Sequence, residues 1–178
     1  MISKYLSILF LLFFYGATAQ YTTIDSLVVA IDGYVEKIDA NQNWTKIDTF
    51  QIENFNAKKT ALVVHYQDDQ VRKVILKTHN TYSESENIYY LQNDSLHYCL
   101  ERNMDYIAPP KNNIHDTATD EFELYQAQNY FKGHILIRQT DNHIHGGSLN
   151  SQEYLKAAGA SILDDFKVLV DLLETKDE

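Results

Sequence analysis

Hydrophobic residues recur with helical spacing near both ends of the chain. In residues 23–41 they lie three or four positions apart, which places them on one face of a helix. The same spacing follows Ser151, a residue suited to cap a helix of about 24 residues. Within this second segment, Gly159 indicates a point of close packing. The pattern predicts an N-terminal helix and a long C-terminal helix.

Between these helices, polar turns separate segments rich in Val, Ile, Tyr, Thr and Phe. Residues 44–52 predict a first strand. Three hairpins follow, which pair residues 61–66 with 71–79, 88–91 with 95–102 and 121–131 with 134–140, around turns at residues 67–70, 92–94 and 132–133. Because helices and strands are segregated along the chain, we expect the α+β class. The expected fold is an antiparallel meander sheet of six or seven strands, with the N-terminal helix and the long C-terminal helix packed on it.

One connection is unusually long. Residues 103–120 have no periodicity of their own and contain Pro109 and Pro110. Most connections in compact domains are much shorter. The segment is either a lid over a sheet face or a flexible edge loop.

The chain begins with the three parts of a secretory signal peptide. Lys4 supplies a basic start, residues 5–15 are almost entirely apolar, and Ala-Thr-Ala precedes Gln20. The apolar run is shorter than the about 20 residues of a membrane span, and no later segment resembles one. We predict a signal peptide over residues 1–19 and a single α+β domain over residues 20–178, which is periplasmic or secreted.

The order of the predicted elements along the chain is similar to that of other exported proteins. The signal peptide, the amphipathic helix and the hairpin at residues 130–137 (YFKGHILI) resemble small uncharacterised exported proteins of Gram-negative bacteria. The resemblance concerns architecture and implies no functional residues.

Composition narrows the class of protein. Of 178 residues, 44% are hydrophobic, which excludes a disordered or collagen-like chain. Asp and Glu exceed Lys and Arg by 25 to 15, for a net charge of -10, which argues against a nucleic-acid partner. The single cysteine, Cys99, cannot form an intramolecular disulfide, and we expect it to be a buried thiol.

The densest polar cluster is a candidate metal site. Asp141, His143 and His145 alternate, so in extended backbone their side chains would point to one side and could hold a metal ion. His134 or His115 could complete the set. The alternative, which we favour, is a polar linker before the last helix. We expect no cofactor.

Aromatic residues are predicted on both faces of the sheet. Counting outward from the turns, the face expected to take the helices carries Tyr89, Tyr98 and Tyr130. The other face, expected to be less covered and thus a candidate ligand or partner surface, carries Tyr90, His97 and Tyr125. The alternative is that helices cover both faces.

The sequence contains no G-x-S-x-G, H-E-x-x-H or G-x-G-x-x-G motif. We therefore expect a non-enzymatic exported module that binds an unknown protein or a small apolar ligand. The alternatives are a periplasmic carrier of an apolar small molecule or lipid, and a metal-dependent enzyme that uses His143 and His145.

Overall fold

A computed structural model of the chain describes residues 23–52, 57, 59–106, 122–142 and 151–174. A helix over residues 23–39 precedes seven strands and a C-terminal helix, α2 (Gln152–Glu174). The strands form one antiparallel sheet in chain order, so the predicted α+β meander is confirmed. The strands are β1 (Lys46–Gln51), β2 (Lys59–Gln67), β3 (Gln70–His79), β4 (Ser83–Gln92), β5 (Ser95–Tyr106), β6 (Phe122–Lys132) and β7 (Ile135–Asp141).

Three tight hairpins join these strands at the predicted places. Asp68 and Asp69 have φ values of 52° and 59°, and Asn93 and Asp94 have 52° and 58°. Two consecutive positive φ values match the right-handed twist of the flanking strands, and Asn and Asp tolerate this region best among non-glycine residues. In the third hairpin Gly133 takes this conformation, with φ of 61°.

Each hairpin carries a β-bulge at the same distance from its turn. The strand pairing skips one residue in β3, β5 and β7, namely Arg72, His97 and Ile137. A bulge resets the alternation of side chains beyond it. Leu96 therefore joins the same cluster as Tyr89, whereas Tyr98 lies on the other face with Tyr90. The predicted grouping of Tyr89 with Tyr98 and Tyr130 is wrong for this reason.

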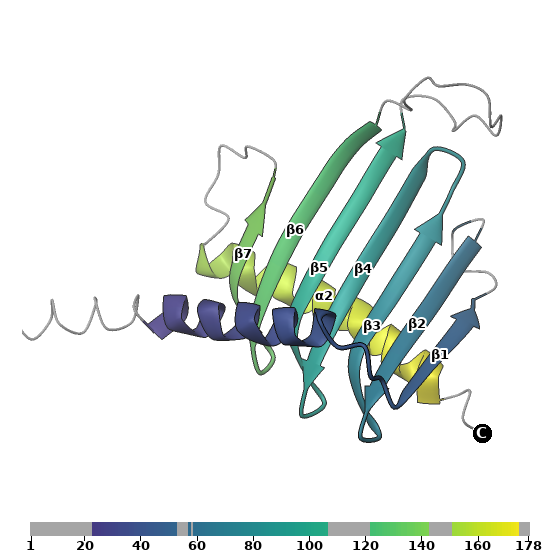
Figure 1. Cartoon of the computed structure of the whole chain (residues 1–178). Coiled ribbons are helices and arrows are strands. Elements are labelled where there is room, and N and C mark those ends of the chain that lie inside the picture. Colours follow the sequence, from purple (N-terminus) through teal and green to yellow (C-terminus); the bar gives the residue numbers. More distant parts are fainter. Residues whose placement is uncertain (1–22, 53–56, 58, 107–121, 143–150, 175–178) are drawn as a thin grey trace, which may run out of the picture.

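The two helices cover opposite faces of the sheet (Figure 1). Behind the sheet in that view, α2 packs on a cluster that includes Tyr89 and Phe131. In front, the N-terminal helix packs on the other face, where its buried residues Ile31 and Ile38 meet a group of sheet residues. That group comprises Ile88, Tyr90, Tyr98, Leu100 and Tyr130. The sheet is thus the middle of three layers.

Three aspartates, each seven residues from the next, attach the N-terminal helix to strands β7, β6, β4 and β3. Asp25 pairs with Arg138 of β7, and Asp32 accepts a hydrogen bond of 3.0 Å from Tyr130 of β6. Asp39 contacts β3 and β4. Residues seven apart lie on nearly one helix face. This acidic stripe therefore sets the direction in which the helix crosses the sheet.

Helix α2 begins and packs as its sequence predicts. The Ser151 hydroxyl accepts a hydrogen bond of 3.2 Å from the backbone N–H of Tyr154, so Ser151 caps the helix. At Gly159, an added Cβ would lie 2.8 Å from Cβ of Leu136 in β7. Glycine is required there because the helix and the strand approach too closely for a side chain.

Strands β4 and β5 extend further than the sequence analysis expected. Strand β4 begins at Ser83 rather than near residue 88, and β5 continues to Tyr106 into the expected 103–120 connection. The added segments are polar apart from Met104 and Tyr106, and they pair with each other from Ser83 opposite Asp105 onward. Pairing on both sides holds them extended despite their low β-propensity. The rest of that connection lies outside the described residues.

Cys99 is fully buried, and burial raises the pKa of its thiol, so the expectation of a buried thiol is confirmed. Among the described residues, no helix is both long enough and apolar enough to cross a membrane.

Candidate functional site

Among the described residues, the face under the N-terminal helix is only partly covered. The helix crosses the sheet near the hairpin turns, and strands β3 to β6 continue well beyond it (Figure 1). On this extension lies an open groove of about 700 Å³ that spans β1 to β6. The groove is the candidate functional site.

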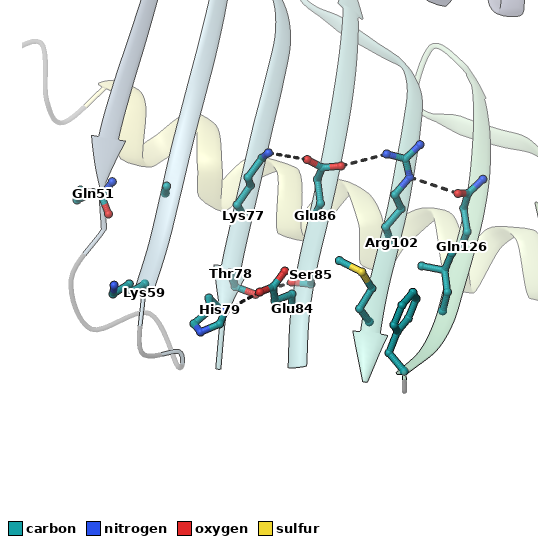
Figure 2. A pocket seen from close by; sticks show the side chains of 14 residues that line it. Gln51, Lys59, Lys77, Thr78, His79, Glu84, Ser85, Glu86, Arg102 and Gln126 are labelled. Atoms are coloured by element: carbon teal, nitrogen blue, oxygen red, sulfur yellow. Dashed lines mark hydrogen bonds and ion pairs between the residues drawn. The ribbon is translucent and has the colours of Figure 1, made fainter. Parts of the chain in front are cut away.

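A row of polar side chains crosses the floor of the groove (Figure 2). The Lys77 ammonium lies 2.9 Å from Oε1 of Glu86, and Nη1 of Arg102 lies 3.1 Å from Oε2 of the same carboxylate. Nε of Arg102 donates to Oε1 of Gln126 at 3.2 Å. These residues are direct partners on β3, β4, β5 and β6, so strand register aligns them. We call Lys77, Glu86, Arg102 and Gln126 the charged row.

Glu86 is held in its ionised form. Burial acts to raise the pKa of its carboxyl, but the hydrogen bonds and charges of Lys77 and Arg102 outweigh burial and lower the pKa. A carboxylate bound between two cations is a poor proton carrier near neutral pH. The charged row is therefore suited to binding and unsuited to acid–base catalysis.

A second pair lies next to the charged row. Nδ1 of His79 is 2.9 Å from Oε1 of Glu84, and both side chains are substantially exposed. The neighbouring hydroxyls of Thr78 and Ser85 are 2.5 Å apart and bond to each other. Because adjacent residues in a strand point to opposite faces, these hydroxyls belong to the α2 face. His79 thus has no adjacent hydroxyl nucleophile on its own face among the described lining residues.

One side of the groove is apolar. Met104, Leu124 and Phe122 line it on β5 and β6, and we call them the apolar strip. Phe122 is 50% exposed and Leu124 is 40% exposed. Exposed side chains of this size beside fixed charges are typical of a binding surface.

A second hollow lies between α2 and the sheet. This cavity of about 340 Å³ is lined almost entirely by apolar side chains near the C-terminal half of α2. Its lining comprises Tyr66, Val71, Val74, Leu91, Asp94, Phe166, Leu169, Val170 and Leu173.

A buried polar network joins the first turn of α2 to the sheet. Tyr154 donates to Gln139, whose side-chain nitrogen donates to Oδ1 of Asn129 at 2.6 Å. The Asn129 side chain in turn donates to Oε2 of Glu101 at 2.8 Å. Burial raises the pKa of the Glu101 carboxyl, the hydrogen bond from Asn129 opposes that rise, and the charge of Asp165 adds to it. The contacts give this network a structural role.

The three residues of the predicted binding surface do not lie together. Tyr90 is 2% exposed and belongs to the core under the N-terminal helix, so the expectation that it is accessible is wrong. His97 lies on the same face, with its ring 6.2 Å from that of Tyr34. Tyr125 follows the alternation of Ala127 and lies on the α2 face, where burial and then Glu101 raise the pKa of its hydroxyl. Roles of His97 and Tyr125 in binding stay predictions.

The candidate metal site falls at the edge of the described chain. Asp141 is the last residue of β7, and His143 and His145 lie outside the described residues. Within the described part of the chain, no three His, Cys, Asp or Glu side chains are grouped to hold a metal ion.

The sequence analysis missed the charged row because Glu86 lies in a polar segment that we did not assign to a strand. One signal was present in the sequence. If the meander continues to residue 83, the negative Glu86 lies between the positive Lys77 and Arg102 on the neighbouring strands. Cross-strand pairs of opposite charge stabilise a sheet even where hydrophobic residues are lacking.

Comparison of the chain with protein-family models, with curated protein sequences and with solved structures found no match.

Proposed function

We propose that the protein is an exported, non-enzymatic binding module whose ligand occupies the groove beyond the N-terminal helix. The observation that carries this proposal is the partial cover of one sheet face, which leaves a groove of about 700 Å³ among the described residues. The fixed charges and the apolar strip of the groove can orient a ligand. Because Glu86 is paired with Lys77 and Arg102 and its pKa is lowered, this carboxylate is better suited to binding than to proton transfer.

Export is supported by the basic, apolar and small-residue segments of the N-terminus. Expressed in a Gram-negative host, the protein should be found in the periplasmic fraction with Gln20 as its first residue. N-terminal sequencing tests this, and intact Met1 on soluble protein would refute it.

Binding in the groove is tested with Nile red, a neutral apolar probe that fluoresces when shielded from water. The double variant Phe122→Ser/Leu124→Ser should weaken probe binding by about tenfold, because it removes the exposed apolar surface of the groove. The matched control is Ile135→Ser, an exposed apolar residue outside the groove. Equal effects of the two changes would reject the groove as the site.

The apolar cavity beside α2 favours a second candidate function, that of a carrier of an apolar small molecule or lipid. Val170→Trp would fill that cavity. If Val170→Trp abolishes Nile red binding and Phe122→Ser/Leu124→Ser does not, the carrier function replaces the groove proposal. A metal-dependent function of His143 and His145 stays a prediction, and metal analysis of the purified protein tests it.

A further inference from the structure

We propose that the ligand of the groove is a single-chain organic anion with an apolar body, such as a fatty acid free in solution. Its negative head would bind Lys77 and Arg102, and its body would lie on the apolar strip. This inference rests on the proposed binding function and names the class of ligand.

The groove and the whole chain carry net charges of opposite sign. The described lining of the groove contains three fixed cations, Lys59, Lys77 and Arg102, and two carboxylates, Glu84 and Glu86. Its excess is positive (3 - 2 = 1), whereas the whole chain has a net charge of -10. A positive groove on an acidic protein attracts a small anion, while the overall charge opposes attachment to an anionic membrane.

Arg102 and Lys77 have more hydrogen-bond donors than their described partners accept. Arg102 has five N–H donors, of which Nε serves Gln126 and one N–H of Nη1 serves Glu86. The Lys77 ammonium has three, of which one faces Glu86. Among the described residues, no other acceptor bonds to the remaining donors of these two side chains. Both side chains are about half exposed, at 41% for Arg102 and 57% for Lys77. A carboxylate has the geometry to accept from such a pair.

Glu86 would affect the binding of an anion in two opposite ways. Its carboxylate holds both cations in place, which prepares them for a ligand without a large loss of side-chain entropy. It also neutralises one of them, so it competes with the ligand's head. Replacing this carboxylate by an amide should therefore strengthen anion binding, which is the opposite of what a purely structural role predicts.

The charged row and the apolar strip lie next to each other along β5 and β6. Met104 follows Arg102 by two residues on β5, on the same face, so about 7 Å separates the charged row from the apolar strip. Leu124 lies directly opposite Met104, and the Phe122 ring is 6.3 Å from that of Tyr106. One small molecule can reach both parts.

The test compares decanoate, decanol and decyltrimethylammonium, three ligands with one chain and different heads, by calorimetric titration of the purified protein. We expect decanoate to bind about tenfold more tightly than decanol and the cation to bind more weakly still. Decanoate affinity should fall with added salt, while decanol affinity should not.

The variants separate charge from packing. Arg102→Met and Lys77→Met should each weaken decanoate about tenfold and leave decanol unchanged, and Glu86→Gln should strengthen decanoate severalfold. Lys46→Met is the matched control, since Lys46 also pairs with a carboxylate but lies outside the groove. Should an arginine or lysine variant fail to fold, the Glu86→Gln result alone decides.

Each failure has a distinct meaning. Equal binding of decanoate and decanol, both lost in Phe122→Ser/Leu124→Ser, would overturn the anion assignment and leave the proposed function standing. Tighter binding of the cation, or sedimentation with phosphatidylglycerol vesicles, would also overturn the assignment. If neither charge variants nor apolar-strip variants alter the binding of any ligand, both this inference and the proposed function are wrong.

Discussion

The hydroxyl of Tyr90 donates to the carboxylate of Asp39, at 2.9 Å from one oxygen and 3.0 Å from the other. Lys73 also reaches Asp39, at 2.6 Å, and its ammonium lies 5.1 Å from the centre of the Tyr90 ring. Burial, followed by the charge of Asp39, raises the pKa of the Tyr90 hydroxyl, which therefore remains a donor at neutral pH. This contact fixes the last turn of the N-terminal helix to β3 and β4.

Tyr90 should matter for stability rather than for binding. Tyr90→Ala should lower the free energy of unfolding by about 3–5 kcal/mol, because it removes a buried ring. Tyr90→Phe should lower it by about 1 kcal/mol, the value of one lost hydrogen bond. Urea unfolding measures both, with the exposed Tyr82→Phe as control. A Tyr90→Ala variant of unchanged stability would mean that the N-terminal helix is not attached to this face.

Two glycines in helices should respond to alanine in opposite ways. At Gly33 of the N-terminal helix nothing lies within 4 Å of an added Cβ, so Gly33→Ala should stabilise by about 0.5–1 kcal/mol. At Gly159 the added Cβ would meet Cβ of Leu136 at 2.8 Å. Overpacking of this kind costs about 1–3 kcal/mol, so Gly159→Ala should destabilise despite the better helix propensity of alanine. Thermal melting of the two variants tests the pair, and stabilisation by both would show that α2 and β7 separate easily.

The side of α2 that faces the sheet should be sensitive to truncation. Leu169 is buried, and the ring of Phe166 lies 5.4 Å from that of Tyr89. Leu169→Ala and Phe166→Ala should each cost about 2–5 kcal/mol. Lys167 is exposed, and Lys167→Ala should change stability by less than about 0.5 kcal/mol. Equal small losses at all three positions would indicate that α2 does not pack on the sheet of its own chain.

Helices and hairpin turns could be predicted from the sequence because their signals are local. Helical spacing gave both helices, and the Asn93-Asp94 turn needs only residues that tolerate positive φ. The bulge at His97 has no signal in the local sequence, because any residue type can occupy a bulge. One unpaired residue moves every later side chain of that strand to the other face of the sheet. The strand ends beside the turns were therefore predicted closely, whereas the face assignments across the bulges and the far ends of β4 and β5 were not.

The candidate site was hidden for a related reason. Glu86 and Arg102 lie in strands because their segments pair with a neighbouring strand on each side. Such pairing depends on tertiary structure, so it cannot be predicted from the alternation of hydrophobic and polar residues. Which half of the face the described residues leave open depends on where the acidic stripe places the N-terminal helix. That placement is set by Asp32 and Asp39 meeting Tyr130 and Tyr90, contacts between distant parts of the chain.

The half-buried carboxyl of Glu101 should make the protein less stable at neutral pH than it would be with an amide there. Burial raises its pKa in the folded state above the unfolded value of about 4.3. The folded state thus binds this proton more tightly, so the contribution of Glu101 is most favourable below the unfolded pKa and is lost as pH rises through the folded pKa. Glu101→Gln keeps an oxygen that can accept from Asn129 and removes the ionisation.

We therefore expect Glu101→Gln to raise the free energy of unfolding at pH 7 and to lose that advantage as the pH falls toward 4. Urea unfolding across this range measures the difference between the variant and the original chain, which cancels the opposite pH dependence contributed by Glu86. Glu123→Gln, which changes an exposed carboxyl on β6, is the control for the removal of one negative charge from the sheet. If Glu101→Gln instead destabilises at pH 7, the ionised carboxylate is needed by the Asn129–Gln139–Tyr154 network, and its hydrogen bond from Asn129 outweighs the cost of burying its charge.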